Sequence, residues 1–374
     1  IAGYYPVYYN VSDHSLNNAV QVIRTVKVNE LPSAPTAVNV YVDYDGETHT
    51  ASANVSSGLS VIWYDAPSGG NITVAPSGIN KGVYLAYAES KDTVTGCISN
   101  TRTLVTLSIS ANVLTVTADP KSKIYGSENP VLTFQYAGWQ GDDDESVLDT
   151  IPTISTSVNI YSSVGEYEDS IVISGGADSN YSFIYIPADF TIYKDTLLVT
   201  AFDQTVIYGS PIGAITINAN YSISGYDNSD NSSVISGLNT ISYLTNYSDT
   251  THAGTSGIYI SPQVSALSAL NYYFITQDGS ITINKASQYI NFHPLPYTQP
   301  LNTFDTIFIY ATSTSSLPVT ISMAAGSAAS LNEGPPDQYF LTNIGDTGNV
   351  VLYANQPGNI NYESAPQVTL SMNV

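Results

Sequence analysis

Apolar and polar residues alternate over short runs along most of the chain, and clusters of Gly, Pro, Asn and Asp separate these runs. Because successive side chains of a β-strand point to opposite faces of a sheet, this alternation predicts strands with one buried face. No stretch shows the spacing of an amphipathic helix, so we expect no helices. Short strands between turn residues are typical of antiparallel β-sandwiches. Near the N-terminus we expect strands at residues 38–42, 59–64, 82–88 and 103–109.

One such pattern occurs twice. The stretch LTVTADPKSKIYG at residues 114–126 returns as LLVTAFDQTVIYG at residues 197–209, an offset of 83 residues. Asn180-Tyr181 and the strand that follows it return as Asn271-Tyr272 and a similar strand, an offset of 91 residues. Segments that open and close on the same residues at a constant period indicate tandem copies of one domain type.

Each copy opens with a strand whose apolar side chains alternate with polar ones and are therefore candidates for the core. These side chains are Leu114, Val116 and Ala118 in the first copy and Leu197, Val199 and Ala201 in the second. The first copy has further expected strands at residues 131–136, 153–157, 170–173 and 181–186. The second copy is more divergent between residues 212 and 262.

The sequence therefore predicts an all-β chain of tandem immunoglobulin-like β-sandwich domains. Residues 1–30 read as a hairpin around a turn at residues 12–18, and we interpret them as the last strands of a domain that is cut off upstream. Trp63 is a candidate core residue of the next domain. Very few residues separate neighbouring repeats, as in FTIYKDTLLVTA, so we expect an extended rod. The expected domains are residues 1–30, 31–111, 112–194, 195–285 and 286–374.

Charge and cysteine content narrow the possible functions. The chain has 31 Asp and Glu residues against 9 Lys and Arg residues, a formal net charge of -22, which excludes binding to nucleic acids and to anionic membrane surfaces. The single cysteine, Cys97, cannot form an internal disulfide, and we interpret it as a small buried residue. No apolar run is long enough to span a membrane, and no leader opens the chain, so we expect the interior of a mature protein.

Residues 114–192 resemble the MBG (mostly bacterial immunoglobulin-like) repeats of very large surface proteins of Bacteroidota. The resemblance rests on LTVTADPKSKIYGSENP, Gly138, the acidic turn before Ser146, VGEY at residues 164–167 and ISGGADSNYSF. Residues 197–283 keep only the ends of the pattern, so residues 195–285 are a divergent MBG-type repeat. Residues 44–103 resemble a related unit that often precedes MBG repeats, and residues 3–26 resemble the end of bacterial surface immunoglobulin-like repeats.

The resemblance implies a structural stalk or repeat segment of a secreted bacterial cell-surface adhesin or filament, similar to the giant adhesins of gliding bacteria. Its partners would be an adhesion target, with glycans as one class, and the neighbouring repeats of the same chain. One alternative is a glycan-binding module that uses exposed tyrosines, because the chain has 30 of them. Tyrosines at alternate strand positions also serve as packing residues. Another alternative is a set of accessory repeats of a secreted enzyme.

Catalytic chemistry is not indicated. The histidines fall in different domains and show neither metal-ligand spacing nor a triad arrangement. Glu166 and Glu168 share one face of an expected strand, as the paired carboxylates of glycosidases do, but a sandwich edge offers them no cleft. We therefore expect no enzymatic activity. The histidines are His14, His49, His252 and His293.

The densest charge cluster consists of Asp142, Asp143, Asp144 and Glu145. Adjacent carboxylates are suitable ligands for Ca²⁺, a hard ion that takes about six to eight oxygens. The alternative is a solvated turn, because four consecutive carboxylates lack the alternating spacing of a calcium loop. Asp13, near the predicted hairpin turn, and Asp119 lie near expected domain junctions and are weaker candidates for a shared ion. No other cofactor is expected.

A further pattern is Asp, then Ser or Thr, then an aliphatic residue or Thr. It resembles the O-glycosylation sequon of secreted Bacteroidota proteins, in which the central hydroxyl is the acceptor and lies on an exposed turn. The alternative is an ordinary entry from a turn into a strand. The candidate acceptors are Thr93, Thr150, Ser170, Thr196, Thr250 and Thr306.

Overall fold

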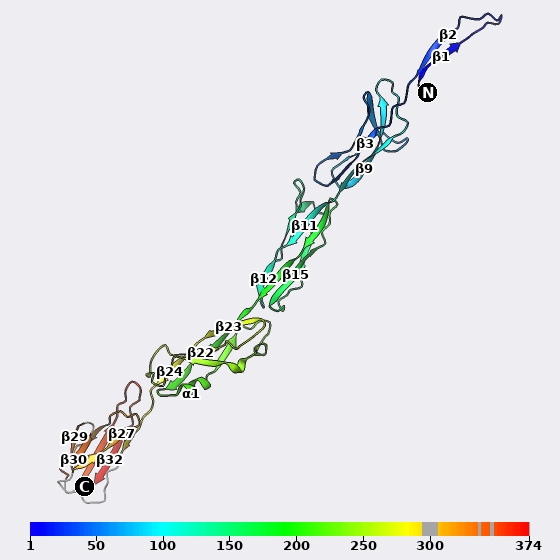
Figure 1. Ribbon diagram of the computed structural model, residues 1–374. Coiled ribbons are helices and arrows are strands. Elements are labelled where there is room, and N and C mark those ends of the chain that lie inside the picture. Colours follow the sequence, from blue (N-terminus) through cyan, green and yellow to red (C-terminus); the bar gives the residue numbers. More distant parts are fainter. Residues whose placement is uncertain (294–305, 336–337, 345–347, 374) are drawn as a thin grey trace. The chain divides into compact units, whose positions relative to one another are not determined.

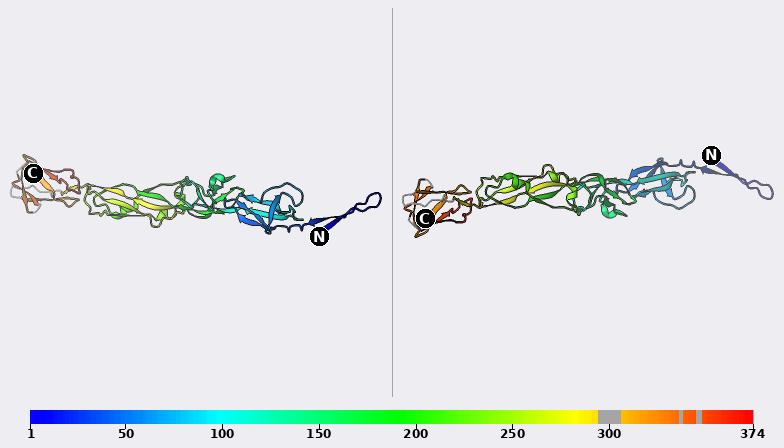
Figure 2. Two further views of the ribbon diagram at one scale, coloured as in Figure 1. Left: turned by 90° about the horizontal axis from the view of Figure 1, so that it is seen from above. Right: turned by 90° about the horizontal axis from the view of Figure 1, so that it is seen from below.

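The computed structural model describes residues 1–293, 306–335, 338–344 and 348–373 (Figure 1). Nearly all regular elements are β-strands, and the sheets pack face to face, so the predicted fold class of tandem β-sandwich domains is confirmed (Figures 1 and 2). The chain divides into two compact units. The first contains Ile1–Lys123 and Ser127–Ile192, and the second contains Ile124–Gly126 and Tyr193–Val374. The finer division into five domains stays a prediction.

The first unit begins with the predicted hairpin. Strand β1 (Gly3–Tyr9) pairs antiparallel with β2 (Val22–Val28), and a bridge between Ser12 and Asn18 closes the expected turn. Inside the turn, the Asp13 carboxylate accepts the backbone N–H of Ser15 at 2.9 Å and of Asn17 at 2.8 Å. These bonds hold the pKa of Asp13 below its usual range. The carboxylate therefore already has a role in the turn.

The strands between Thr36 and Ser110 form the next sandwich, which contains a sheet of order β4-β10-β9-β7 and the pairs β3-β6 and β5-β8. Asn39 divides the expected strand 38–42, because its side-chain oxygen accepts the N–H of Thr106 at 2.8 Å. Trp63 is half-buried and packs against a core that includes Val105 and Leu107. The strands are β3 (Thr36–Val38), β4 (Val40–Asp43), β5 (His49–Thr50), β6 (Ser52–Asn54), β7 (Leu59–Tyr64), β8 (Ser77–Gly78), β9 (Gly82–Asp92) and β10 (Thr103–Ser110).

The first repeat forms two sheets, of order β13-β11-β16 and β12-β17-β15-β14 (Figure 1). The predicted core side chains Leu114, Val116 and Ala118 are at most 3% exposed, so the alternation was interpreted correctly. The elements are β11 (Asn112–Ala118), β12 (Lys121–Ile124), β13 (Phe134–Ala137), the 3-10 helix η1 (Glu145–Val147), β14 (Thr153–Thr156), β15 (Gly165–Ser174), β16 (Tyr181–Ile186) and β17 (Ala188–Tyr193).

The second repeat, in the second unit, has the same sheet orders with equivalent strands, β20-β18-β23 and β19-β24-β22-β21. Its predicted core residues Leu197, Val199 and Ala201 are also buried. The elements are β18 (Asp195–Ala201), β19 (Gln204–Ile207), α1 (Ile212–Ile217), β20 (Tyr221–Ser224), η2 (Ser232–Val234), η3 (Leu238–Thr240), β21 (Ser242–Thr245), β22 (Tyr259–Gln263), β23 (Tyr272–Gln277) and β24 (Gly279–Asn284).

Helix α1 contradicts the expectation that the chain has no helices. Pro211 precedes it with a φ of -70°, a value compatible with a helix start, and Ile215 fixes the helix by packing into the core. Six residues are too few to show a helical period in the sequence, which is why the pattern did not reveal it.

The last sandwich of the second unit contains the sheets β25-β27, β26-β30-β29 and β28-β31-β32. Ile309, Leu341, Val350 and Leu352 form the centre of its core. The strands are β25 (Ile290–Phe292), β26 (Ile307–Ile309), β27 (Ala311–Ser313), β28 (Thr320–Met323), β29 (Ser330–Gly334), β30 (Gln338–Thr342), β31 (Asn349–Asn355) and β32 (Val368–Asn373).

One glycine in each repeat positions the loop that carries the candidate site. Gly138 follows β13 with a φ of 111°, and Gly225 follows β20 with a φ of 99°. A Cβ atom on Gly138 would lie 2.5 Å from the carbonyl oxygen of Val113, and one on Gly225 would lie 2.6 Å from that of Thr196. Only glycine permits this approach, which directs the next residues over the end of the opening strand.

Candidate functional site

The first cluster of polar groups lies inside the first unit and joins residues of two successive sandwiches. Tyr44, which follows β4, packs edge-on against Tyr181 of β16, with ring centroids 5.5 Å apart and an interplanar angle of 81°. Asp143 Oδ2 accepts the hydroxyl of Tyr44 at 3.0 Å and that of Tyr181 at 2.7 Å. The N–H of Gln140 donates to the Tyr181 hydroxyl at 2.9 Å, and Trp139 packs on the same ring. We call these residues the first tyrosine cluster.

The second unit contains the same arrangement. Tyr125, in the segment Ile124–Gly126, packs edge-on against Tyr272 of β23 at 5.4 Å and 82°. Asp230 Oδ2 accepts the hydroxyl of Tyr125 at 3.1 Å and that of Tyr272 at 2.8 Å. The N–H of Asp227 donates to the Tyr272 hydroxyl at 3.0 Å, and Tyr226 packs on the Tyr272 ring. This second tyrosine cluster repeats the first contact by contact.

Tyr181 and Tyr272, the buried tyrosines of the two clusters, stay protonated at neutral pH. Burial, and next the hydrogen bond to Asp143, raises the pKa of Tyr181. Burial also raises the pKa of Tyr272. A protonated hydroxyl donates to a carboxylate in a charge-assisted bond, which is stronger than a bond between neutral groups. Each aspartate therefore binds two tyrosine hydroxyls. One of the two tyrosines, Tyr44 or Tyr125, comes just before a turn in a different part of the chain.

A third tyrosine pair lies in the second unit and lacks the aspartate. Tyr208 packs against Tyr362 at 5.5 Å and 74°. Next to them, the side chain of Asn361 contacts Nδ1 of His252 and accepts the N–H of Ala253 at 3.1 Å. The ring contact is therefore common to all three places, whereas the shared carboxylate is found in two.

The backbone fixes the position of the first tyrosine in each pair. The N–H of Tyr44 donates to the carbonyl of Ser110, that of Tyr125 to Tyr193 and that of Tyr208 to Asn284, each at 2.9 Å. Each acceptor lies at or near the end of a closing strand, β10, β17 or β24. The ring is thus presented at the point where the chain leaves one sandwich. These contacts can hold sandwiches together.

The predicted calcium ligands have separate partners. Asp143 belongs to the first tyrosine cluster, Asp144 caps η1, and Glu145 accepts the hydroxyl of Tyr136 at 3.1 Å. Asp142 is exposed. Within the described ranges, no group of three or more His, Cys, Asp or Glu side chains is placed to hold a metal ion. Calcium binding at residues 142–145 stays a prediction.

The predicted glycosylation acceptors differ in accessibility. Ser170 and Thr196 are half-buried, and the Ser170 hydroxyl donates to the carbonyl of Tyr167 at 2.8 Å. Asp305, which opens the last of the six sequences, lies outside the described residues. Glycan attachment itself stays a prediction. The exposed candidates are Thr93, Thr150, Thr250 and Thr306.

The remaining candidates are dispersed or already bonded. His49 contacts the Asp45 carboxylate at 3.0 Å, and the Asp119 carboxylate accepts the hydroxyl of Thr133 at 2.5 Å. Cys97 is half-buried, not fully buried as expected, because it lies in the turn between β9 and β10. Glu166 and Glu168 are both exposed on β15, whereas His14 lies in the hairpin turn and His293 follows β25. In the described part of the chain, no helix is long and apolar enough to cross a membrane.

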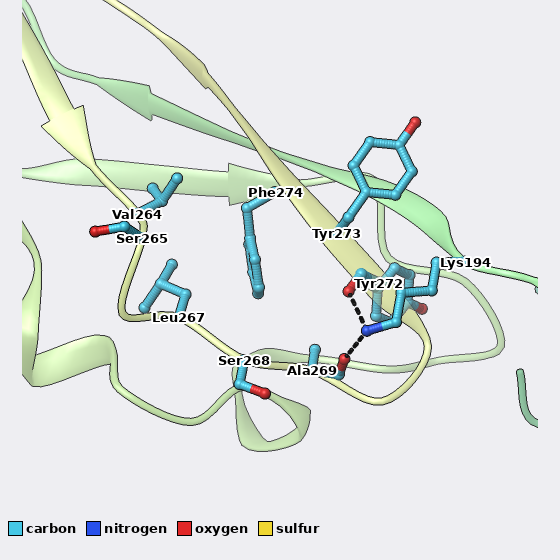
Figure 3. A pocket seen from close by; sticks show the side chains of 9 residues that line it. All are labelled: Lys194, Val264, Ser265, Leu267, Ser268, Ala269, Tyr272, Tyr273 and Phe274. Carbon is cyan, nitrogen blue, oxygen red and sulfur yellow. Dashed lines mark hydrogen bonds between the residues drawn. The ribbon is translucent and has the colours of Figure 1, made fainter.

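A hollow of about 320 Å³ lies beside β23 in the second repeat (Figure 3). Val264, Leu267 and Phe274 form its apolar wall. At one end, Lys194 Nζ donates to the carbonyl of Ala269 at 2.7 Å. The hollow therefore combines an aromatic ring with an ammonium group.

In the first repeat, the side chain of Tyr185 occupies the position that is equivalent to the hollow. There the ring of Tyr185 stacks on Phe183 at 6.0 Å and 16°, and its hydroxyl accepts the N–H of Gly176 at 2.9 Å. The strand register places Thr276 in the second repeat where the first has Tyr185, and Phe274 where the first has Phe183. The shorter threonine leaves Phe274 without the covering ring.

Comparison with known proteins identifies the family of one segment. Residues 114–191 match the family described as MBG domain (YGX type). The MBG domain therefore covers the first repeat and includes Tyr125 and Gly126. Among curated proteins, none matches the chain.

Several solved structures of extracellular domains match the chain at low similarity. Protocadherin gammaB7 EC3-6 is 11% identical over 91% of this chain and 99% of that chain, with a TM-score of 0.34. Protocadherin Gamma B7 extracellular cadherin domains 1-4 are 9% identical over 90% and 99%, with a TM-score of 0.29. Drosophila N-cadherin EC1-4 is 8% identical over 99% and 82%, with a TM-score of 0.19. At these values the likeness carries no argument about function.

The shared aspartate of each cluster was not recognised from the sequence. Tyr125 and Tyr272 lie in the repeated segments, but Asp230 does not stand out in the sequence, and Asp143 is there a candidate calcium ligand or part of a solvated turn. A third offset in the sequence points to these aspartates. Asp143 and Asp230 lie 87 residues apart, and so do Gly138 and Gly225. An aspartate that returns between two repeated tyrosines indicates a shared contact.

Proposed function

We propose that the chain is a structural stalk or repeat segment of a secreted bacterial cell-surface adhesin or filament, which projects a distal adhesive region. The observation that carries the proposal is the recurrence of the tyrosine cluster with the same contacts in both units. A stalk needs contacts that hold consecutive sandwiches, as Tyr44 and Asp143 do inside the first unit. The match of residues 114–191 to an MBG domain supports a repeat region.

The surface chemistry is compatible with this role. A formal net charge of -22 keeps copies of the chain apart and disfavours anionic partners. The proposed partners are an adhesion target outside the cell, with glycans as one class, and neighbouring repeats of the same chain. A gliding-motility adhesin is the narrowest form of the proposal and rests on sequence resemblance alone. No catalytic role is proposed.

Small-angle scattering of the full chain tests the proposal. A single compact body of this length has a radius of gyration of about 21 Å, whereas sandwiches placed end to end extend to roughly 150 Å, with a radius of about 40 Å. We expect the larger value. A compact particle would overturn the stalk. An Asp143→Ala/Asp230→Ala variant should broaden the distance distribution, whereas Asp142→Ala, the matched control at an exposed carboxylate, should leave it unchanged.

The hollow at Phe274 favours a second candidate function, glycan binding. In the first repeat an aromatic ring with a hydroxyl covers the equivalent phenylalanine. A pyranose ring, which has an apolar C–H face and hydroxyls at its edge, is the ligand type that fits the uncovered Phe274. Lys194 at the edge of the hollow supplies a donor for a sugar hydroxyl or carboxylate.

A glycan array probed with the full chain separates the two functions. Binding that is lost in Phe274→Ala and reduced in Lys194→Met, but retained in Tyr4→Ala at an exposed hairpin position, would establish the second candidate. If the chain binds no glycan, or binds equally well without Phe274, the hollow has no such role.

A further inference from the structure

The two tyrosine clusters differ in charge at two equivalent positions. Gln140 and Asp227 each donate a backbone N–H to the buried tyrosine hydroxyl, at 2.9 and 3.0 Å. Asn112 and Asp195 each open the first strand of their repeat and donate a backbone N–H to the asparagine before that tyrosine, at 2.9 and 3.0 Å. The first cluster therefore has amides at positions where the second has carboxyl groups.

The carboxyl groups of Asp195 and Asp227 contact each other, and Asp227 also contacts the turn. The side chain of Asp227 is hydrogen-bonded to that of Asp195, and Asp230 lies close enough to interact electrostatically. Asp227 also packs directly on Gly126, because a Cβ atom on Gly126 would lie 2.4 Å from Asp227 Cγ. The contact places Asp227 between a second carboxyl group and the backbone of the Tyr125–Gly126 turn.

No cation compensates these carboxyl groups. In the described part of the chain, neither Asp195, Asp227 nor Asp230 forms a salt bridge. Lys194 follows the closing strand next to Asp195, but its ammonium group donates to the backbone carbonyls of Ala269 and Tyr272. The other groups that face Asp227 are neutral, since the Tyr125 and Tyr272 hydroxyls donate to Asp230, and the pKa of Tyr226 is raised by burial.

We propose that protonation of the Asp195–Asp227 pair controls whether the Tyr125–Gly126 turn stays docked in the second unit. Two carboxyl groups can share a hydrogen bond only while one of them carries a proton. When both ionise they repel each other, and the repulsion acts on Asp227, whose side chain lies directly against the turn. The first cluster, with Gln140 and Asn112, has no equivalent dependence.

The direction of the pH dependence follows from the docked state. Burial, and then the Asp195 carboxyl group, raises the pKa of Asp227 above its ordinary value. A raised pKa means that docking is most stable below the ordinary aspartate pKa of about 4 and weakens as the pH rises through the higher, docked value. The turn is therefore more firmly docked in mildly acidic than in neutral solution.

Hydrogen exchange of the full chain tests the proposal. The Tyr125 amide donates to the Tyr193 carbonyl when the turn is docked, and the Tyr44 amide donates to Ser110 in the first cluster. After correction for intrinsic exchange, the protection of the Tyr125 amide should fall as the pH rises from about 4.5 to 8. The fall should be up to about tenfold for each pH unit by which docking raises the pKa of Asp227. The protection of Tyr44 should stay constant.

The matched variant Asp195→Asn/Asp227→Gln gives the second cluster the side chains of the first. It should make the Tyr125 protection independent of pH, with the buried Val199 amide as a check that the sandwich is folded. A wild-type Tyr125 protection that does not change with pH, or a change that persists in the variant, would overturn the proposal. If the variant does not fold, carboxyl NMR decides, because an Asp227 that titrates at the ordinary aspartate value contradicts a shared proton. Neither readout depends on the stalk function.

Discussion

At the scale of single residues, Asp143 is the most connected group of the first tyrosine cluster, because one oxygen accepts both hydroxyls. Asp143→Ala removes this shared acceptor and leaves two buried donors, the hydroxyls of Tyr44 and Tyr181, unpaired. We expect the free energy of unfolding of the first unit to fall by about 2 to 4 kcal/mol. Tryptophan fluorescence during urea unfolding measures this change, since both tryptophans, Trp63 and Trp139, lie in the first unit.

The neighbouring Asp142→Ala is the control, because this side chain is exposed. A surface substitution of this kind changes stability by less than about 0.5 kcal/mol. Equal effects of the two substitutions would mean that the shared carboxylate does not stabilise the cluster.

Arg102 forms an ion pair with Glu89, a second buried carboxylate. Its guanidinium lies 3.3 Å from the ring centroid of Tyr64, donates to Glu89 at 3.1 Å and donates to the carbonyl of Ala66 at 2.9 Å. Glu89 is only 5% exposed. Arg102→Met leaves this carboxylate unpaired and should cost about 3 to 5 kcal/mol, measured by the same fluorescence assay.

The double variant Arg102→Met/Glu89→Leu should recover most of that loss, because an apolar pair replaces the ion pair without leaving a buried charge. If Arg102→Met alone costs less than about 1 kcal/mol, the ion pair is not a significant source of stability.

Asp143 also shows why the candidate site was only partly predictable. Its hydroxyl partners are 99 and 38 residues away in sequence, so nothing in its local surroundings indicated them. Locally it lies among three other acidic residues, a pattern that favours a solvated turn or a cation. Tyr125 and Tyr272, in contrast, were visible as repeated residues, although their contact was not.

At the scale of elements, a change of glycine to alanine can have opposite effects on stability, through backbone strain at Gly138 and through helix propensity at Gly213. Gly138 has a φ of 111°, and a Cβ atom there would lie 2.5 Å from a carbonyl oxygen. Gly138→Ala should therefore destabilise the first unit by at least about 1 to 3 kcal/mol, the range for a strained backbone position. Urea unfolding followed by tryptophan fluorescence measures this loss.

Gly213 in α1 is the matched opposite case, because no atom lies within 4 Å of the position that an alanine methyl group would take. Gly213→Ala should stabilise the second unit by up to about 1 kcal/mol through helix propensity. Circular dichroism during thermal unfolding detects both the loss of stability in Gly138→Ala and the gain in Gly213→Ala. A loss at Gly213, or none at Gly138, would contradict these assignments.

The strands were predictable to the extent that one face is buried. Leu114, Val116 and Ala118 alternate with threonines and became the core of β11, and β7 was predicted at its observed bounds. Helix α1 was missed because a single short helix gives no period, and its position depends on packing of Ile215 that no local pattern encodes.

At the scale of the whole molecule, charge repulsion should limit stability. With a formal net charge of -22 and few compensating cations, added salt screens unfavourable interactions between carboxylates. We expect the melting temperature to rise by several degrees between about 0.01 and 0.5 M sodium chloride, a range over which the Debye length falls from roughly 30 Å to a few ångströms. A falling melting temperature would show that attractive ion pairs dominate instead.

The same assay addresses calcium. At matched ionic strength, a calcium site at residues 142–145 would add a stabilisation that sodium chloride does not give, and Asp142→Asn/Asp144→Asn would remove it. If calcium and sodium salts act equally, the acidic turn holds no specific ion.

Repetition was the feature of the whole chain that the sequence revealed best. The offsets between the opening strands and between the Asn-Tyr pairs indicated copies of one domain, and both copies have the same sheet order. The middle of the second copy has little residue identity with the first, because its strands keep the pattern of burial rather than the residues themselves.

The tyrosine clusters have two chemically different sides, a tyrosine before a turn and an aspartate with its own tyrosine. A gene built from such modules can gain or lose whole copies by recombination, since Tyr44 and Tyr125 meet acceptors of the same shape. Excising residues 112–194, for example, would bring Tyr44 to Asp230 and Tyr272 in place of Asp143 and Tyr181. An excision that begins or ends inside a module would leave a tyrosine without its carboxylate. Length is then the property that evolution can change most freely in such a protein.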